Sequence, residues 1–152
     1  MAGHRGGLPA AALQRARTLA ETRLDIDAEG LTTLEADVQT WVPPARAYDL
    51  VLVAYLHLPA KQRGLVMRAA AEAVAAGGTL LVVGHDLENL GSGHGGPQNP
   101  AVLYRPGDIV TDIEPAELIV DRSETVRRPM TDGQGQPVEA LDALVVGRRP
   151  VG

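Results

Sequence analysis

Residues 48–59, whose sequence is YDLVLVAYLHLP, decide the fold of this chain. The middle of the stretch, from Leu50 to Ala54, is continuously apolar and does not alternate between apolar and polar residues. A strand with one face in water alternates, whereas a strand of a parallel sheet that is covered by helices on both faces does not. The stretch therefore predicts a buried strand in an α/β domain.

The residues that follow predict a helix and a second strand. Residues 61–76 carry an apolar stripe at helical spacing, and Gly77-Gly78 would cap the end of this helix. Residues 79–84, with the sequence TLLVVG, predict another buried strand. A strand, a helix and a strand at this spacing form a right-handed crossover, so the two strands are expected to be parallel.

Further elements are predicted on both sides of this unit. Upstream, apolar residues at helical spacing after Pro9 predict a helix over residues 9–23, and residues 31–38 predict a short strand. Downstream, residues 107–113 predict a short helix. Residues 117–126 and 141–148 predict two strands, and the turn-rich residues 129–137 between them indicate an antiparallel hairpin at one edge of the sheet. Residues 1–8 are expected to be a disordered start, which leaves one domain over residues 9–150.

Composition excludes several classes of function. The net charge is −5, and the chain has one Trp, three Tyr and no Phe, so a nucleic-acid partner is not expected. With no Cys, the chain has neither a cysteine nucleophile nor a thiolate metal site. The sequence has no apolar run of transmembrane length and no signal-peptide core at its amino terminus. A cytoplasmic protein without a membrane partner is therefore predicted.

The order of these segments resembles the middle and end of a class I S-adenosylmethionine-dependent methyltransferase. The resemblance rests on EADV at residues 35–38, on YDLV at 48–51 running into YLHLP at 55–59, and on GGTLLVVG at 77–84. It spans residues 9–150 and is closest to the small-molecule enzymes of the tellurite- and thiopurine-resistance type. It implies an α/β fold with a Rossmann-like, mostly parallel sheet and a terminal antiparallel hairpin. It also implies S-adenosylmethionine as cofactor and a small-molecule substrate as the methyl acceptor.

The resemblance implies cofactor contacts at Asp37, Val38, Ala54 and Tyr55. Asp37 would accept a hydrogen bond from the adenine amine, with the backbone of Val38 close to the ring. The alternative for Asp37 is a turn cap after a strand, because Asp favours turns on its own account. The sequence leaves both interpretations open.

Two histidines at strand ends, His57 and His85, are the candidate catalytic residues. In an open α/β sheet, ligands bind at the carboxyl ends of the strands. His57 could act as a general base toward a hydroxyl or thiol acceptor, because the pKa of imidazole lies near neutrality. The alternative is a histidine that packs at the strand end and is satisfied by backbone groups. His85 and its neighbour Asp86 could contact substrate or cap the loop, and as strand neighbours they point to opposite faces.

A long glycine-rich loop, residues 85–100, follows the second strand. Residues 91–96, GSGHGG, match the pattern G-x-G-x-x-G, but a dinucleotide site needs that pattern directly between a strand and a helix. The loop is therefore interpreted as a lid over the site, with Asn89, Gln98 and Tyr104 joining Asp86 as candidate substrate contacts. No metal site is expected, because the four histidines lack ligand spacing.

The resemblance also implies a missing part. Class I methyltransferases hold the cofactor on a glycine-rich loop after the first strand and on an acidic residue that ends the second strand. Only eight residues precede Pro9, so the first two strands and both anchors are expected to be absent. An amino-terminally truncated domain, a misassigned start at Met1 and a domain completed by another chain remain open.

Two functions follow from this interpretation. The first is methyl transfer to a small molecule, impaired by the missing cofactor loop. The second is a catalytically silent remnant that serves as an oligomerisation or interaction module. A hydrolase is disfavoured, because no serine lies in a G-x-S-x-G elbow.

The missing strands would also leave an unpaired sheet edge. An exposed aliphatic edge strand is a template for association. Residues 50–54 are therefore expected to be paired on both sides, either by residues 31–38 or by a second copy of the chain. The protein is accordingly not expected to be a stable, cofactor-saturated monomer.

Overall fold

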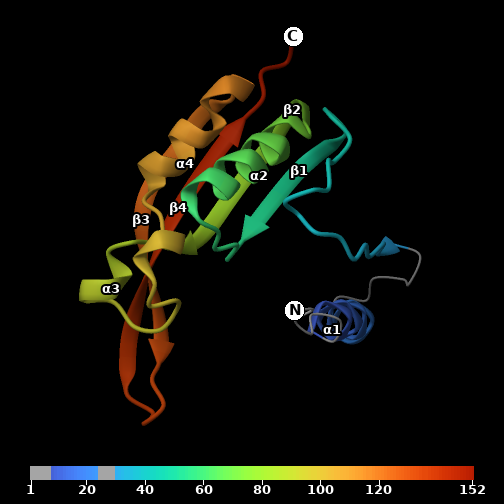
Figure 1. Ribbon diagram of the computed structural model, residues 1–152. Coiled ribbons are helices and arrows are strands. Elements are labelled where there is room, and N and C mark those ends of the chain that lie inside the picture. The colour runs from blue at the N-terminus through green and yellow to red at the C-terminus, as the bar shows by residue number, and fades with distance from the viewer. Residues whose placement is uncertain (1–7, 24–29) are drawn as a thin grey trace, which may run out of the picture. The chain divides into compact units, whose positions relative to one another are not determined.

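The computed structural model describes residues 8–23 and 30–152, which form parts of two compact units, Met1–Trp41 and Val42–Gly152 (Figure 1). The first unit contains helix α1, Leu8–Arg23, which confirms the helix predicted over residues 9–23. Of the predicted disordered start, all but Leu8 lies outside the described residues.

The prediction of a strand at residues 31–38 is wrong. Residues 31–37 are irregular and residues 38–40 form a turn. The backbone carbonyl of Asp37 accepts hydrogen bonds from the N–H groups of Thr40 and Trp41 at 3.0 and 2.8 Å, and its carboxylate accepts one from the N–H of Gln39 at 2.9 Å. An apolar pattern alone does not make a strand, because a strand needs a neighbour for its backbone groups. The turn-cap interpretation of Asp37 describes what this residue does here.

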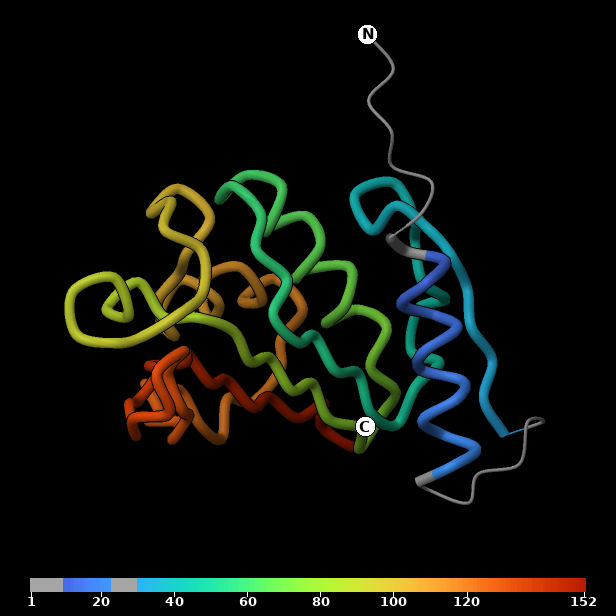
Figure 2. The backbone as a smooth tube through the Cα atoms, turned by 90° about the horizontal axis from the view of Figure 1, so that it is seen from below, coloured from blue at the N-terminus to red at the C-terminus, as the bar shows by residue number. Residues whose placement is uncertain are grey.

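The second unit is built on a four-stranded sheet with the order β1-β2-β4-β3. Strand β1, Tyr48–Ala54, is parallel to β2, Val74–His85, and helix α2, Ala60–Glu72, connects them as the predicted crossover (Figure 2). Strand β2 begins five residues earlier than predicted, at residue 74 instead of 79. The predicted glycine cap of the helix therefore lies inside β2, where Gly77 has a φ of +77°.

The predicted antiparallel hairpin is confirmed at the other edge of the sheet. Strands β3, Ile119–Thr131, and β4, Pro137–Arg148, pair antiparallel, and β4 also pairs antiparallel with β2. Both strands are longer than predicted because the turn is short. The carboxylate of Asp132 accepts hydrogen bonds from the N–H groups of Gln134 and Gln136, both at 2.8 Å, and so closes the turn locally.

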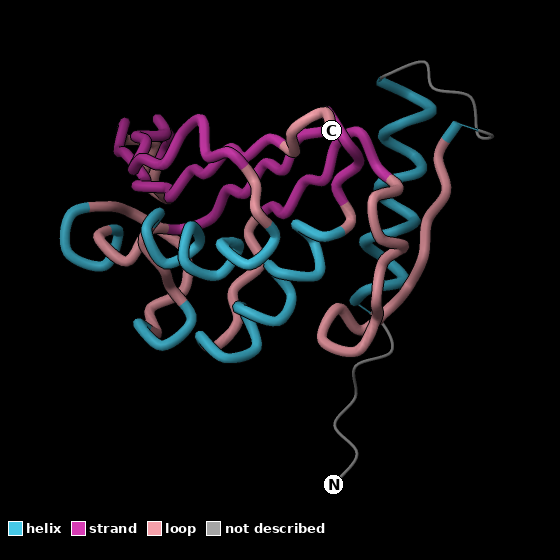
Figure 3. Tube along the Cα trace, turned by 90° about the horizontal axis from the view of Figure 1, so that it is seen from above, coloured by secondary structure: helices cyan, strands magenta, loops and turns pink. Residues whose placement is uncertain are grey.

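The helices of this unit lie on one face of the sheet (Figure 3). The prediction that the strand at residues 48–59 is buried by helices on both faces is therefore wrong, and Leu50 and Leu52 of β1 are 61% and 56% exposed. Helix α4, Pro106–Ile113, packs beside α2, and the short helix α3, Asn89–Ser92, lies in the loop after β2. The core between sheet and helices is aliphatic and contains Met67, Leu80, Val82, Ile109, Ile113 and Val145. Within the described ranges, no helix has the length and apolar character needed to cross a membrane.

Arg149, just after β4, closes the base of this core. Its buried guanidinium donates to the backbone carbonyls of Val74, Ala71 and Ala116 at 2.7, 2.9 and 3.1 Å. These carbonyls come from the start of β2, the end of α2 and the turn after α4. One side chain therefore ties three elements together.

Candidate functional site

The parallel strands β1 and β2 end side by side, and their last residues begin the candidate site. Strand β1 ends because Tyr55 adopts a left-handed backbone conformation, with a φ of +52°. Left-handed conformations are uncommon for residues other than glycine and occur often at functional sites. The turn brings the Tyr55 ring to 5.1 Å from the ring of His85, measured between ring centres.

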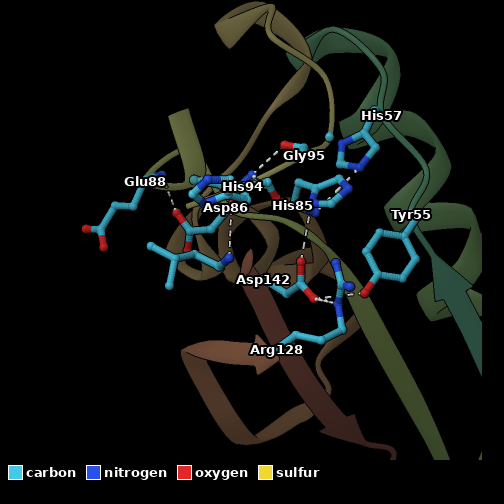
Figure 4. A network of polar contacts seen from close by, with 12 residues as sticks. Tyr55, His57, His85, Asp86, Glu88, His94, Gly95, Arg128 and Asp142 are labelled. Atoms are coloured by element: carbon cyan, nitrogen blue, oxygen red, sulfur yellow. Dashed lines mark hydrogen bonds and ion pairs between the residues drawn. The ribbon is translucent and has the colours of Figure 1, made fainter. Parts of the chain in front are cut away.

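Asp142 of β4 lies at the centre of the polar cluster (Figure 4). It is 1% exposed, and its Oδ2 accepts hydrogen bonds from the Tyr55 hydroxyl at 2.8 Å and from Nε of Arg128 at 2.7 Å. The other oxygen, Oδ1, is 3.3 Å from Nδ1 of His85. This is an ion-pair distance, but neither atom makes a hydrogen bond within the described part of the chain. One buried carboxylate thus contacts a phenol, a guanidinium and an imidazole.

Arg128 of β3 forms the exposed side of this cluster. Its side chain is 41% exposed, and its guanidinium carbon lies 5.5 Å from the centre of the Tyr55 ring. The hydrogen bond to Asp142 raises the pKa of Arg128. Burial raises the pKa of Tyr55, and the hydrogen bond to the Asp142 carboxylate raises it further. Tyr55 therefore stays a neutral hydrogen-bond donor at physiological pH.

His57 lies on the other side of His85. The two imidazole rings are stacked with 5.3 Å between their centres. Nδ1 of His57 is 3.3 Å from the carbonyl oxygen of Val102, and because a carbonyl only accepts, we infer that Nδ1 carries the proton. Nε2 then accepts a long hydrogen bond from the backbone N–H of His85 at 3.5 Å. Both ring nitrogens thus contact backbone groups, which is the alternative interpretation of His57. Burial lowers the pKa of His57, so this imidazole is neutral at neutral pH.

Tyr104 closes the floor of the site and is fully buried. Its ring lies 5.7 Å from the His57 ring, and its hydroxyl makes no hydrogen bond within the described residues. The hydroxyl rests against the backbone of Gly84, where a Cβ atom would collide with it. Burial raises the pKa of Tyr104 to about 12. A side chain at this depth supports the histidines but offers no exposed surface to a substrate.

Asp86 and Asn89, two other predicted substrate contacts, are buried and hold the loop after β2. Asp86 is 0% exposed and accepts hydrogen bonds from the Thr125 hydroxyl at 2.7 Å and the Glu88 N–H at 2.9 Å. Asn89 accepts from the Leu141 N–H at 2.7 Å and donates to the Gly95 carbonyl at 2.8 Å. These contacts correspond to the loop-capping alternative for Asp86.

The predicted lid lies against His85. Gly95 and Gly96 have φ values of +73° and +78°, and a Cβ atom on Gly96 would lie 2.7 Å from Cδ2 of the His85 ring. Gln98 is exposed and donates to the Gly96 carbonyl at 3.3 Å. Of the predicted substrate contacts, Gln98 is therefore the one whose side chain is accessible.

The second unit brings the predicted histidines together with Ala54 and Tyr55, two of the four predicted cofactor residues. Ala54 and Tyr55 lie at the end of β1, whereas Asp37 and Val38 belong to the first unit. In the described residues, no strand pairs with β1 on the side away from β2, and no glycine-rich turn joins a strand to a helix there. The described residues of the second unit thus do not by themselves form a complete S-adenosylmethionine site.

Asp142 and Arg128 were not among the predicted site residues. Asp142 enters the cluster through the strand register, since it pairs with His85 of β2 and with Val126 of β3, and Arg128 follows two residues after Val126. Neither residue lies at the carboxyl end of a parallel strand, where open α/β sheets bind ligands.

The fold has clear counterparts among solved structures. TehB from Haemophilus influenzae matches with a TM-score of 0.61 and 15% identity over 90% of this chain and 46% of its own. The S-adenosylmethionine-dependent methyltransferase SibL matches with a TM-score of 0.60 and 23% identity over 93% of this chain and 41% of its own. A methyltransferase from Methanosarcina mazei matches with a TM-score of 0.57 and 12% identity over 91% and 79%.

This chain has the class I methyltransferase fold. No protein-family model matches its sequence, and no curated protein matches it significantly. The chain spans less than half the length of TehB and SibL. Relative to the methyltransferase fold, the polar cluster lies where the two parallel strands end, which is where open α/β sheets bind ligands.

Proposed function

We propose that the protein takes part in S-adenosylmethionine-dependent methyl transfer to a small molecule, with the Asp142 cluster as its acceptor side. A pair of buried polar atoms beside the ends of β1 and β2 supports this proposal. His85 Nδ1 and Asp142 Oδ1 lie 3.3 Å apart, and neither makes a hydrogen bond within the described residues. Buried polar atoms are nearly always satisfied, so this pair marks a place where a ligand or ordered water can complete the contacts.

The described residues can handle the proton of an acceptor. His57 is neutral near pH 7, and its Nε2 can take the proton from a hydroxyl or thiol if it exchanges its long 3.5 Å contact with the His85 N–H for the acceptor. Tyr55 donates a hydrogen bond to Asp142, and its oxygen can still accept a hydrogen bond from the acceptor molecule. Such an arrangement would promote methyl transfer by aligning the acceptor with the methyl donor. The base would in addition remove the proton of the acceptor.

A catalytically silent interaction module is the second candidate function. The specific observation in its favour is the incomplete cofactor site, because β1 has no strand on its outer side in the described residues and Asp37 caps a turn. In this second candidate function the polar cluster has no catalytic role, and the outer edge of β1 binds a partner.

Calorimetric titration with S-adenosylmethionine separates the two functions. Saturable heat at micromolar cofactor supports methyl transfer, and no heat supports the silent module. Transfer of a labelled methyl group to a panel of hydroxyl and thiol acceptors then tests the cluster directly. His57→Ala should abolish transfer while leaving the fold intact, and unchanged turnover would remove His57 from the mechanism.

A further inference from the structure

The free edge of β1 is the most exposed apolar feature of the sheet. Leu50 is 61% exposed and Leu52 is 56% exposed, although both lie in a seven-residue strand. Among the described residues, β1 pairs with β2 alone. An edge strand of this kind normally carries charges, a proline or a cover that prevents association. Residues 50–58 contain no charged residue.

The hydrogen bonding of β1 shows which backbone groups are free. The N–H of Tyr55 donates to the Val83 carbonyl in β2 at 2.7 Å. Alternate residues of a parallel strand bond to the same neighbour. Val51 and Val53 therefore face β2, and the N–H and C=O groups of Leu50, Leu52 and Ala54 point to the open edge.

The side chains of Leu50 and Leu52 extend an aliphatic face of the sheet. Leu52 is in register with Leu81 of β2, and Leu81 is in register with Val146 of β4, so these side chains lie on one face. This is the face opposite the helices, because Val51, Val53, Leu80 and Val82 pack in the helix-covered core. Leu81 and Val146 are only partly buried. The edge and the open face together form one apolar surface.

We propose that a second copy of the chain pairs with this edge, antiparallel, about a twofold axis through Leu52. In this register Leu52 faces Leu52 of the other copy, and Leu50 faces Ala54. The free backbone groups of all three residues then meet their counterparts and form six hydrogen bonds, two for each hydrogen-bonded pair of residues. The four-stranded sheets join into one sheet with a continuous aliphatic face.

Charge favours a second copy as the partner in this register. Asp49 is the one charged residue of β1, and it would lie opposite Tyr55 of the other copy rather than opposite Asp49. Like charges directly opposite destabilise a strand pair, and this register contains none. The leucine side chains at the dyad gain cross-strand apolar contacts. The inference does not depend on cofactor binding or methyl transfer.

Single-cysteine variants test the register, because the natural chain contains no Cys. Cα atoms in a hydrogen-bonded antiparallel pair are about 5.5 Å apart, which a disulfide can bridge. Leu52→Cys should therefore form a covalent dimer on mild oxidation. Leu50→Cys is the matched control, since its two copies would lie four residues apart along the strands, roughly 13 Å, and should not cross-link.

The oligomeric state of the unmodified full chain completes the test. Sedimentation velocity across a concentration series should show a dimer, and Leu52→Lys should shift it to a monomer with an unchanged far-ultraviolet circular dichroism spectrum. A monomer throughout would overturn the proposal and would mean that the edge is covered within the chain or by a different protein. Equal cross-linking of both cysteine variants, or of neither, would also overturn it.

Discussion

Asp142 should stabilise the folded protein through its contacts with Tyr55, Arg128 and His85. Two replacements that remove different parts of these contacts test this. In Asp142→Asn the side chain keeps its shape, and the amide oxygen can still accept from the Tyr55 hydroxyl. The charge partner of Arg128 is lost. A hydrogen bond to a charged group contributes about 1.5–3 kcal/mol when well shielded. The Arg128 side chain is 41% exposed, so screening reduces this value, and we expect a loss of about 1–2 kcal/mol.

Asp142→Ala should cost more than Asp142→Asn. It leaves the Tyr55 hydroxyl without its partner at 2.8 Å and opens a cavity beside His85. A buried polar group left without a hydrogen-bond partner adds about 1–3 kcal/mol to the loss of stability. Urea unfolding followed by circular dichroism measures both variants. Asp121→Asn is the control, because the ion pair of Asp121 with Arg148 lies on the surface and should not affect unfolding measurably.

A spectroscopic signature separates the electrostatic role of Asp142 from packing. The Asp142 carboxylate is one cause of the raised pKa of Tyr55, after burial. Removing its charge should let Tyr55 ionise at a lower pH, which phenolate absorbance detects, and Tyr55→Phe identifies the transition. If Asp142→Ala unfolds like the wild type and the tyrosine titration does not move, the cluster described here does not exist in solution.

Three further predictions follow from single contacts. Burial lowers the pKa of His57 below its unfolded value of about 6.5. The protein should therefore lose stability as the pH falls from about 6.5 to this lowered pKa, because the unfolded chain takes up the proton first. His57→Gln should remove this pH dependence of the free energy of unfolding. Gly96→Ala should destabilise by about 1 kcal/mol or more and weaken acceptor binding, because φ is positive and the Cβ meets His85, whereas Gly91→Ala has open space and should be neutral. Arg149→Met should cost over about 2 kcal/mol in urea unfolding, because three carbonyls lose their donor.

Local patterns predicted the elements whose neighbours are close in sequence. The apolar run of β1, the helical stripe of α2 and the turn of the β3–β4 hairpin each carry their own signal, and all three are in place. Residues 31–38 show the limit of such patterns. Their apolar residues fit a strand, but whether a strand forms depends on a partner elsewhere in the fold.

The candidate site shows the same contrast between local and long-range signals. His57, His85 and Tyr55 were predicted because they end or follow apolar strand-like runs, which the sequence displays. Asp142 was not, since its importance comes from the register between β2 and β4, which sets it against His85. The burial of Asp86 and Asn89 likewise depends on the path of the loop, and loop paths are determined by long-range contacts such as that of Asn89 with Leu141.

The geometry of β1 relates the proposed dimer to the proposed site. Tyr55 and His57 follow the carboxyl end of β1, and an antiparallel pair about Leu52 directs the two carboxyl ends away from each other. The two clusters would therefore lie at opposite ends of the paired β1 strands, too far apart to share a substrate. Neither copy would complete the other's cofactor site, because each contributes the same strand. Pairing at β1 would thus stabilise the sheet without adding a cofactor anchor, so the calorimetric titration tests the cofactor site of each copy in the dimer.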